Sequence, residues 1–210
     1  MFPALYPILD PSLTSAPLVP LAESLAVAGV RLIQLRDKTS SARQLYMNAK
    51  NLTAALFPRG VRVIVNDRPD IAAIVGAGGV HVGQEDLPVE DARRICRLPL
   101  WVGVSTHNLE QLREAARTSA DYIAVGPVFP TATKENPDPV VGTGLLRDAR
   151  RITDKPLVAI GGITLDRAEE VFRAGADSVA VIGDILSADD PAARAREYLA
   201  IAARGFPART

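Results

Sequence analysis

Short apolar runs alternate with helical patterns along the whole chain, and this alternation constrains the fold more than any other feature. Most of the apolar runs are continuous and are not interrupted by polar residues at every second position. Continuous runs are typical of parallel strands that are covered on both faces. The predicted strands are residues 5–9, 32–35, 61–65, 80–82, 101–104, 122–125, 157–160 and 179–182.

Each predicted strand is followed by a segment with helical periodicity. These segments are residues 20–28, 42–56, 69–75, 89–97, 109–118, 145–152, 165–174 and 192–203. Strand–helix pairs repeated in this way over 210 residues predict an α/β fold with a single TIM-barrel domain, (β/α)8, over residues 1–210. Similar short segments, most with glycine, precede the second, fourth, sixth and eighth strands. A repeat of every second unit favours the barrel over the alternative, an open doubly wound sheet.

The composition narrows the range of partners. Lys and Arg together number 24, as do Asp and Glu, so the net charge is zero and we expect neither nucleic acid nor a membrane surface as a partner. The single cysteine allows no disulfide within the chain, and we see no signal peptide and no apolar run long enough to span a bilayer. We therefore expect a cytoplasmic protein with small-molecule partners, and we leave open whether it forms a homo-oligomer.

Polar and small residues gather where the predicted strands end. In a barrel these carboxyl ends all meet on one face, where the active site lies. The residues concerned are Gln34, Arg36, Asp37, Lys38, Asn66, Asp67, Asp86, Ser105, Thr131, Thr133, Lys134, Gly161, Gly162 and Gly183. The longest irregular segment, residues 126–144, also follows a strand, and we predict that it is an active-site loop.

The chemistry of this set indicates a phosphorylated ligand and a metal ion. Arg36, Lys38 and Lys134 are cations, and glycines after the last two strands allow backbone N–H groups to approach a phosphate. Asp67 and Asp86 follow neighbouring strands and supply the oxygen ligands that Mg²⁺ prefers. Together these groups predict a site for a polyphosphate whose leaving charge is neutralised by cations.

Each of these residues also has a simpler interpretation. Asp67 and Asp86 each precede a helical pattern and can act as N-caps. Arg36 and Asp37 can form a solvated surface pair, and His81, inside a strand, is best interpreted as a packed core histidine with its hydrogen bonds satisfied. These simpler interpretations do not explain why phosphate-binding chemistry recurs at the end of one strand after another.

At these strand ends the chain resembles the thiamine phosphate synthase family. The resemblance runs from residue 6 to residue 185 and depends on short motifs in a fixed order. The motifs are QLRDK at 34–38, VNDR at 65–68, GVHVGQED at 79–86, GVS at 103–105, GPVFPTATK at 126–134 and AIGGI at 159–163.

The resemblance implies a transferase that joins 4-amino-2-methyl-5-hydroxymethylpyrimidine diphosphate to a thiazole phosphate or thiazole carboxylate phosphate. It implies pyrimidine-diphosphate contacts from Gln34, Leu35, Arg36, Asp37, Lys38, Asn66, Ser105 and Lys134. Of these, Arg36, Lys134 and Ser105 are the implied catalytic residues. It implies thiazole-phosphate contacts from Thr131, Ala132, Thr133, Gly161, Gly162, Ile182 and Gly183. The implied Mg²⁺ ligands are Asp67 and Asp86.

The sequence departs from the family pattern at two of these positions. Asp37 stands where Glu is typical, and Gly183 stands where Ser is typical. Asp184 adds a negative charge that should weaken phosphate binding if its side chain points inward. Two rival functions remain: a thiazole tautomerase, for which His107 is a poor general acid–base, and a non-catalytic barrel that senses a phosphorylated metabolite.

Overall fold

The computed structural model describes residues 1–97, 99–131 and 138–206, and within them eight parallel strands close into a barrel. Each strand pairs with its neighbour in sequence, and β1 pairs with β8 to complete the ring. The strands are β1 Leu5–Leu9, β2 Leu32–Leu35, β3 Arg62–Asn66, β4 Gly79–Val82, β5 Trp101–Thr106, β6 Tyr122–Val125, β7 Leu157–Ile160 and β8 Ser178–Val181. The prediction of a single (β/α)8 barrel is therefore confirmed.

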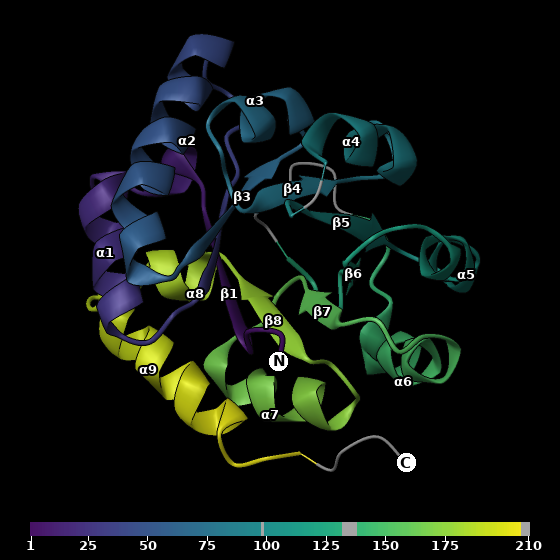
Figure 1. Ribbon diagram of the computed structural model, residues 1–210. Coiled ribbons are helices and arrows are strands. Elements are labelled where there is room, and N and C mark those ends of the chain that lie inside the picture. Colours follow the sequence, from purple (N-terminus) through teal and green to yellow (C-terminus); the bar gives the residue numbers. More distant parts are fainter. Residues whose placement is uncertain (98, 132–137, 207–210) are drawn as a thin grey trace.

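The helices form a ring around the strands (Figure 1). They are α1 Leu18–Val27, α2 Ala42–Leu56, α3 Pro69–Ile74, α4 Val89–Cys96, α5 Leu109–Arg117, α6 Gly142–Ile152, α7 Leu165–Arg173, α8 Gly183–Leu186 and α9 Pro191–Ala202, with 3-10 turns η1 Pro11–Leu13 and η2 Phe57–Arg59. Polar side chains cap several of them: Ser41 accepts a hydrogen bond from the backbone N–H of Gln44 at the start of α2. None of the helices in the described ranges is long and apolar enough to cross a bilayer.

The structure differs from the sequence prediction mainly at the ends of elements. The third strand runs one residue further than predicted because Asn66 pairs with His81 of β4. Helix α6 begins at Gly142, so the predicted loop 126–144 ends sooner than expected. Helix α8 was missing from the predicted set, since its four residues are too few to show a helical period.

Apolar residues fill two separate cores. The larger core lies between the outer face of the barrel and the surrounding helices. The smaller one fills the barrel interior with Tyr6, Ile8, Leu32, Ile64, Tyr122, Ala124, Val158 and Ala180. Gly103 on β5 makes this interior possible, because a Cβ at that position would lie 2.0 Å from the ring of Tyr122. The interior core forms the floor beneath the carboxyl ends of the strands.

Candidate active site

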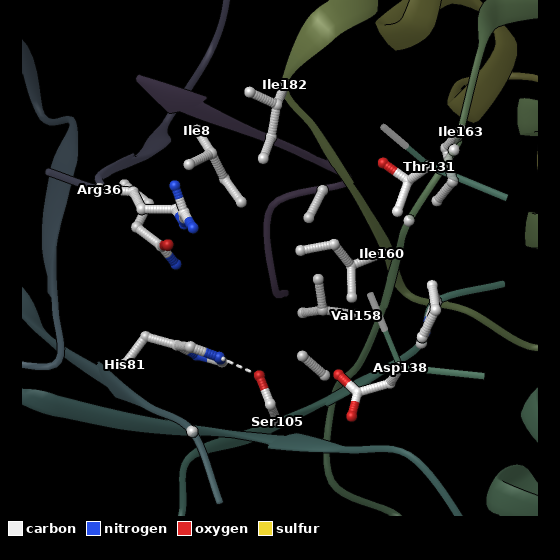
Figure 2. Close-up of a pocket in the computed structure, with 18 of the residues that line it drawn as sticks. Ile8, Arg36, His81, Ser105, Thr131, Asp138, Val158, Ile160, Ile163 and Ile182 are labelled. Carbon is white, nitrogen blue, oxygen red and sulfur yellow. Dashed lines mark hydrogen bonds between the residues drawn. The ribbon is translucent and has the colours of Figure 1, made fainter. Parts of the chain in front are cut away.

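A cavity of about 1200 Å³ opens at the carboxyl ends of the strands. Figure 2 shows Arg36, His81 and Ser105 on one side of it and Thr131 with Ile163 on the other. Apolar side chains such as Val158 line the region between them. The cavity is larger than the roughly 300–1000 Å³ typical of small-molecule sites, so it has room for two small substrates side by side.

Most of the predicted site residues line this one cavity. They are Gln34, Arg36, Lys38, Asn66, Asp67, Asp86, Ser105, Thr131, Gly161, Gly162, Ile182 and Gly183. The remaining predictions divide into two groups. Ala132, Thr133 and Lys134 lie outside the described residues. Leu35 and Asp37 are described but do not line the cavity.

Leu35 and Asp37 point away from the cavity for different reasons. The Leu35 side chain is fully buried in the core between the barrel and its helices, because alternate residues of a strand face opposite sides of the sheet. Asp37 accepts hydrogen bonds from the backbone N–H of Ser40, in the loop before α2, and from Asn48 Nδ2 within α2. Neither side chain faces the cavity, and the assignment of these two residues to the pyrimidine diphosphate stays a prediction.

An acidic corner forms where β3 and β4 end. Asp67 forms a salt bridge with Lys38, and the carboxylate of Asp86 lies close enough to influence its ionisation. Burial raises the pKa of Asp67, the Lys38 ammonium opposes this rise, and the neighbouring Asp86 adds to it. Asp67 also adopts a left-handed backbone with φ of 62°, which is strained for a residue other than glycine and is often found at functional sites.

The alternative interpretation of Asp67 and Asp86 as helix N-caps is wrong. The N-cap residues of α3 and α4 are Arg68 and Pro88, and neither helix has a side-chain cap. Asp86 instead accepts a hydrogen bond of 2.8 Å from the backbone N–H of Gly83, which turns its carboxylate toward the cavity rim.

Arg36 pairs with Asp10 and not with its sequence neighbour, so the interpretation as a surface pair with Asp37 is also wrong. Asp10, at the end of β1, is 3% exposed at its side chain and also accepts from the backbone N–H and hydroxyl of Ser12. Asp10 is not among the predicted site residues. A signal was present, since a lone carboxylate directly follows an apolar strand, as Asp67 follows β3.

His81 is the packed histidine that the sequence predicted, although it also lines the cavity. Its Nδ1 lies 3.1 Å from the Tyr122 hydroxyl, and its Nε2 lies 2.9 Å from Ser105 Oγ (Figure 2). Burial lowers the pKa of His81 to about 4, so the imidazole is neutral at pH 7. Tyr122 and its partner Tyr6 were also missed, because apolar and aromatic residues in a strand predict only a core.

Comparison with known proteins identifies the family. Residues 5–185 match the model of the family described as thiamine monophosphate synthase. The chain belongs to this family. A thiamine-phosphate synthase from Koribacter versatilis (strain Ellin345) is 49% identical over 204 residues, which cover 95% of each chain.

Other relatives agree with this family assignment. A thiamine-phosphate synthase from Methanospirillum hungatei JF-1 is 43% identical over 180 residues, with 86% of this chain and 87% of the relative covered. The solved structure of a thiamine phosphate pyrophosphorylase from Pyrococcus furiosus superposes with a TM-score of 0.86 at 35% identity and covers 96% of each chain.

The cavity of this thiamine monophosphate synthase family member has a second end at β7 and β8. Gly161 and Gly162 have φ values of 98° and 60°, and a Cβ on Gly161 would lie 2.4 Å from Pro127 of the loop after β6. These glycines therefore allow the two loops to pack directly on one another. Arg167 donates to the carbonyl of Gly162 and lies over the ring of Phe129, which holds the same two loops together.

The extra carboxylate of Asp184 has two partners within the fold. The Tyr198 hydroxyl donates to Asp184 Oδ2 at 2.7 Å, and Arg194 Nη1 lies 3.7 Å from the same oxygen. Asp184 still lines the cavity, but these partners offset its charge. Gly183 begins α8 and has open space around its Cα, so the family's usual serine would fit there.

Proposed function

We propose that this chain joins 4-amino-2-methyl-5-hydroxymethylpyrimidine diphosphate to a thiazole phosphate, with thiamine phosphate and pyrophosphate as products. The observation that carries the proposal is the single cavity that contains both the acidic corner at β3–β4 and the glycine-rich end at β7–β8. A diphosphate with its metal suits the first end, and a monophosphate suits the second.

The pyrimidine diphosphate is assigned to the side of the cavity formed by β2 to β5. Gln34, Asn66 and Ser105 offer neutral hydrogen-bonding groups for the ring, while Arg36 and Lys38 offer positive charge for the diphosphate. Lys134, outside the described residues, is proposed as a further cation for the same group. Replacing Lys134 by Ala should lower kcat strongly and leave thermal unfolding unchanged, and normal turnover in that variant would remove it from the mechanism.

The thiazole phosphate is assigned to the opposite end of the cavity. Thr131, Gly161, Gly162, Ile182 and Gly183 line this end, and the glycines expose backbone N–H groups that can bind a phosphate. Ala132 and Thr133 are proposed to complete this end from the loop 126–144. This arrangement would place the thiazole phosphate across the cavity from the diphosphate, with the two rings adjacent between them.

The donors at the acidic corner fit Mg²⁺. Asp67 and Asp86 supply two carboxylates, and no larger group of His, Cys, Asp or Glu suited to a metal occurs in the part of the chain that the structure describes. Mg²⁺ typically binds through one or two carboxylates and takes its other ligands from phosphate and water. When bound there, it would neutralise charge on the diphosphate.

The reaction breaks one bond and forms another. The C–O bond between the pyrimidine methylene and the diphosphate breaks, and the electron pair leaves with pyrophosphate. The thiazole nitrogen uses its lone pair to form the new C–N bond, so no enzyme nucleophile is needed. Arg36 and Lys38 stabilise the departing negative charge, and the cavity walls keep the two rings in contact and limit the access of water.

The decisive assay supplies both substrates with Mg²⁺ and measures thiamine phosphate and pyrophosphate. We expect both products in equal amounts and none when either substrate is omitted. A tautomerase would change the thiazole phosphate in the absence of the pyrimidine, and a sensor would bind ligand without releasing pyrophosphate. Either result would overturn the proposal.

We also propose that the protein acts in the cytoplasm on small phosphorylated substrates. The proposal is supported by the net charge of zero, the single buried cysteine and the phosphorylated character of the proposed substrates. A homo-oligomer is compatible with this function, and sedimentation of the purified protein would determine its state.

A further inference from the structure

A row of polar side chains crosses the inside of the barrel beneath the cavity. Gln34 Nε2 lies 2.9 Å from the Tyr6 hydroxyl, which lies 2.9 Å from the Tyr122 hydroxyl. His81 continues the row through both of its ring nitrogens to Ser105 Oγ. We call Gln34, Tyr6, Tyr122, His81 and Ser105 the buried network. It connects Gln34 and Ser105, which are both assigned to the pyrimidine.

The amide nitrogen of Gln34, which lies against the Tyr6 hydroxyl, sets the direction of the first half of the buried network. The amide nitrogen of Gln34 donates, so the Tyr6 oxygen accepts from it. The Tyr6 hydrogen must then go to Tyr122, which is the other partner of Tyr6 among the described residues. In the opposite direction this hydrogen would have no acceptor among the described residues, and it would have almost no access to water because Tyr6 is 1% exposed. A buried donor without a partner is costly, so this direction is disfavoured.

The second half of the buried network follows from the first. The Tyr122 oxygen already accepts from Tyr6, so its own hydrogen is donated to His81 Nδ1. A ring nitrogen that accepts this hydrogen carries none of its own, so the ring N–H lies on Nε2. There it is donated to Ser105 Oγ.

We propose that Tyr6, Tyr122 and His81 are positioning residues that make Ser105 a hydrogen-bond donor toward the bound pyrimidine. Because Ser105 Oγ accepts from His81, the hydrogen of its own hydroxyl is directed to the cavity. The ligand atom opposite Ser105 must then be an acceptor, such as the lone pair of an aromatic ring nitrogen. The choice of a pyrimidine as this ligand rests on the function proposed above, whereas the direction of the buried network does not.

This polarity has a consequence for substrate specificity. A ring that carries N–H at the position facing Ser105 would place two donors against each other. Ser105 could accept from such a ring only if the direction of the whole buried network were reversed. Reversal would require the hydrogens of His81, Tyr122 and Tyr6 to shift together and would leave one of them unpaired. The site should therefore select the form of the pyrimidine with an unprotonated ring nitrogen at this position.

Nitrogen NMR of the ¹⁵N-labelled protein tests the direction without any substrate. The chain has two histidines, so the His81 signals are assigned by comparison with a His107→Gln variant. We expect His81 to be neutral at pH 7 with its hydrogen on Nε2. A hydrogen on Nδ1 would overturn the proposal. The result does not depend on whether the protein makes thiamine phosphate.

A double-mutant cycle tests the link from Tyr122 to Ser105. We expect Tyr122→Phe and Ser105→Ala each to raise the KM for the pyrimidine diphosphate roughly tenfold and to change the KM for thiazole phosphate less than about twofold. The double variant should be no worse than Ser105→Ala, since both changes remove the same donor. If the double variant raised the KM for the pyrimidine diphosphate by the product of the two single increases, Tyr122 would act independently of Ser105. That result would overturn the proposal.

Two further variants keep this test interpretable. Tyr46→Phe removes a hydroxyl from α2 outside the cavity and should leave both KM values unchanged. Tyr6→Phe replaces Tyr122→Phe in the cycle if the latter does not unfold cooperatively, and the same non-multiplying result is expected. If the unaltered protein makes no thiamine phosphate, the proposed function fails, while the NMR measurement still decides the direction of the buried network.

Discussion

Asp10 and Arg36 form a salt bridge that joins the end of β1 to the end of β2 at the rim of the cavity. The Asp10 side chain is 3% exposed and that of Arg36 is 22% exposed, so the pair is largely shielded from water. Asp10 therefore orients the guanidinium that is assigned to the diphosphate, although Asp10 itself is not assigned to any ligand.

Asp10→Asn should weaken substrate binding through Arg36. The variant keeps the shape of the side chain but removes the charge that holds Arg36, so we expect the KM for the pyrimidine diphosphate to rise roughly fivefold and the free energy of unfolding to fall by about 2 kcal/mol. Kinetic assays and urea unfolding measure the two effects. Asp91→Asn, on an exposed pair with Arg94, is the control. An unchanged KM for the pyrimidine diphosphate in Asp10→Asn would show that Arg36 binds this substrate without being oriented by Asp10.

Asp86→Asn should weaken the dependence on Mg²⁺ without damaging the fold. The Asn amide oxygen can still accept from the backbone N–H of Gly83, but the second carboxylate beside Asp67 is lost. We expect the Mg²⁺ concentration for half-maximal activity to rise on the order of tenfold. Glu114→Gln, an exposed residue of α5, is the matched control. An unchanged Mg²⁺ titration would remove Asp86 from the metal site.

Gly183→Ser should improve binding of the thiazole phosphate. A Cβ at this position meets no atom within 4 Å, so the serine fits and adds a hydroxyl donor next to the backbone N–H groups. We expect the KM for thiazole phosphate to fall roughly threefold, since a hydrogen bond to a charged group is stronger than one to a neutral group. Ala54→Ser adds the same hydroxyl to the exposed face of α2 as a control. An unchanged KM for thiazole phosphate would show that its phosphate does not bind next to residue 183.

Stability should fall as the pH drops from about 6.5 to about 4, because His81 is neutral in the fold. Burial lowers its pKa from 6.5 to about 4, so between these values the unfolded chain binds a proton that the folded chain does not. Stability therefore rises with pH across this window, and the loss on acidification approaches about 3 kcal/mol. Urea midpoints measured at several pH values for the unaltered protein and for His81→Gln give the difference.

The comparison with His81→Gln isolates the histidine from the carboxylates. Asp67 has a raised pKa and contributes in the opposite direction, since its folded form binds a proton more readily than the unfolded chain. That contribution is present in both proteins and cancels in the difference. Equal pH slopes in the two proteins would show that His81 is not kept neutral by the fold.

The sequence by itself determined the barrel and the rim on which the site lies. Continuous apolar runs such as Leu32–Leu35 can be buried on both faces only in a parallel sheet covered by helices. Once the barrel is known, the carboxyl ends of its strands converge, so residues as far apart as Asp67 and Gly183 are predicted at one cavity, and both line it. These predictions needed only the residue types in and after each strand and the rule that the carboxyl ends of barrel strands lie on one face.

Only the tertiary structure decided which side chains contact one another at that rim. Tyr6 and Tyr122 are separated by 116 positions, and the pairing of Arg36 with Asp10 spans 26. No local pattern encodes such contacts, because they depend on strand register, on the space left by Gly103 and on which face each residue presents. Leu35 lies one position from two cavity residues and faces the outer core, because alternate residues of a strand face opposite sides and only the structure shows which side of β2 faces the barrel interior.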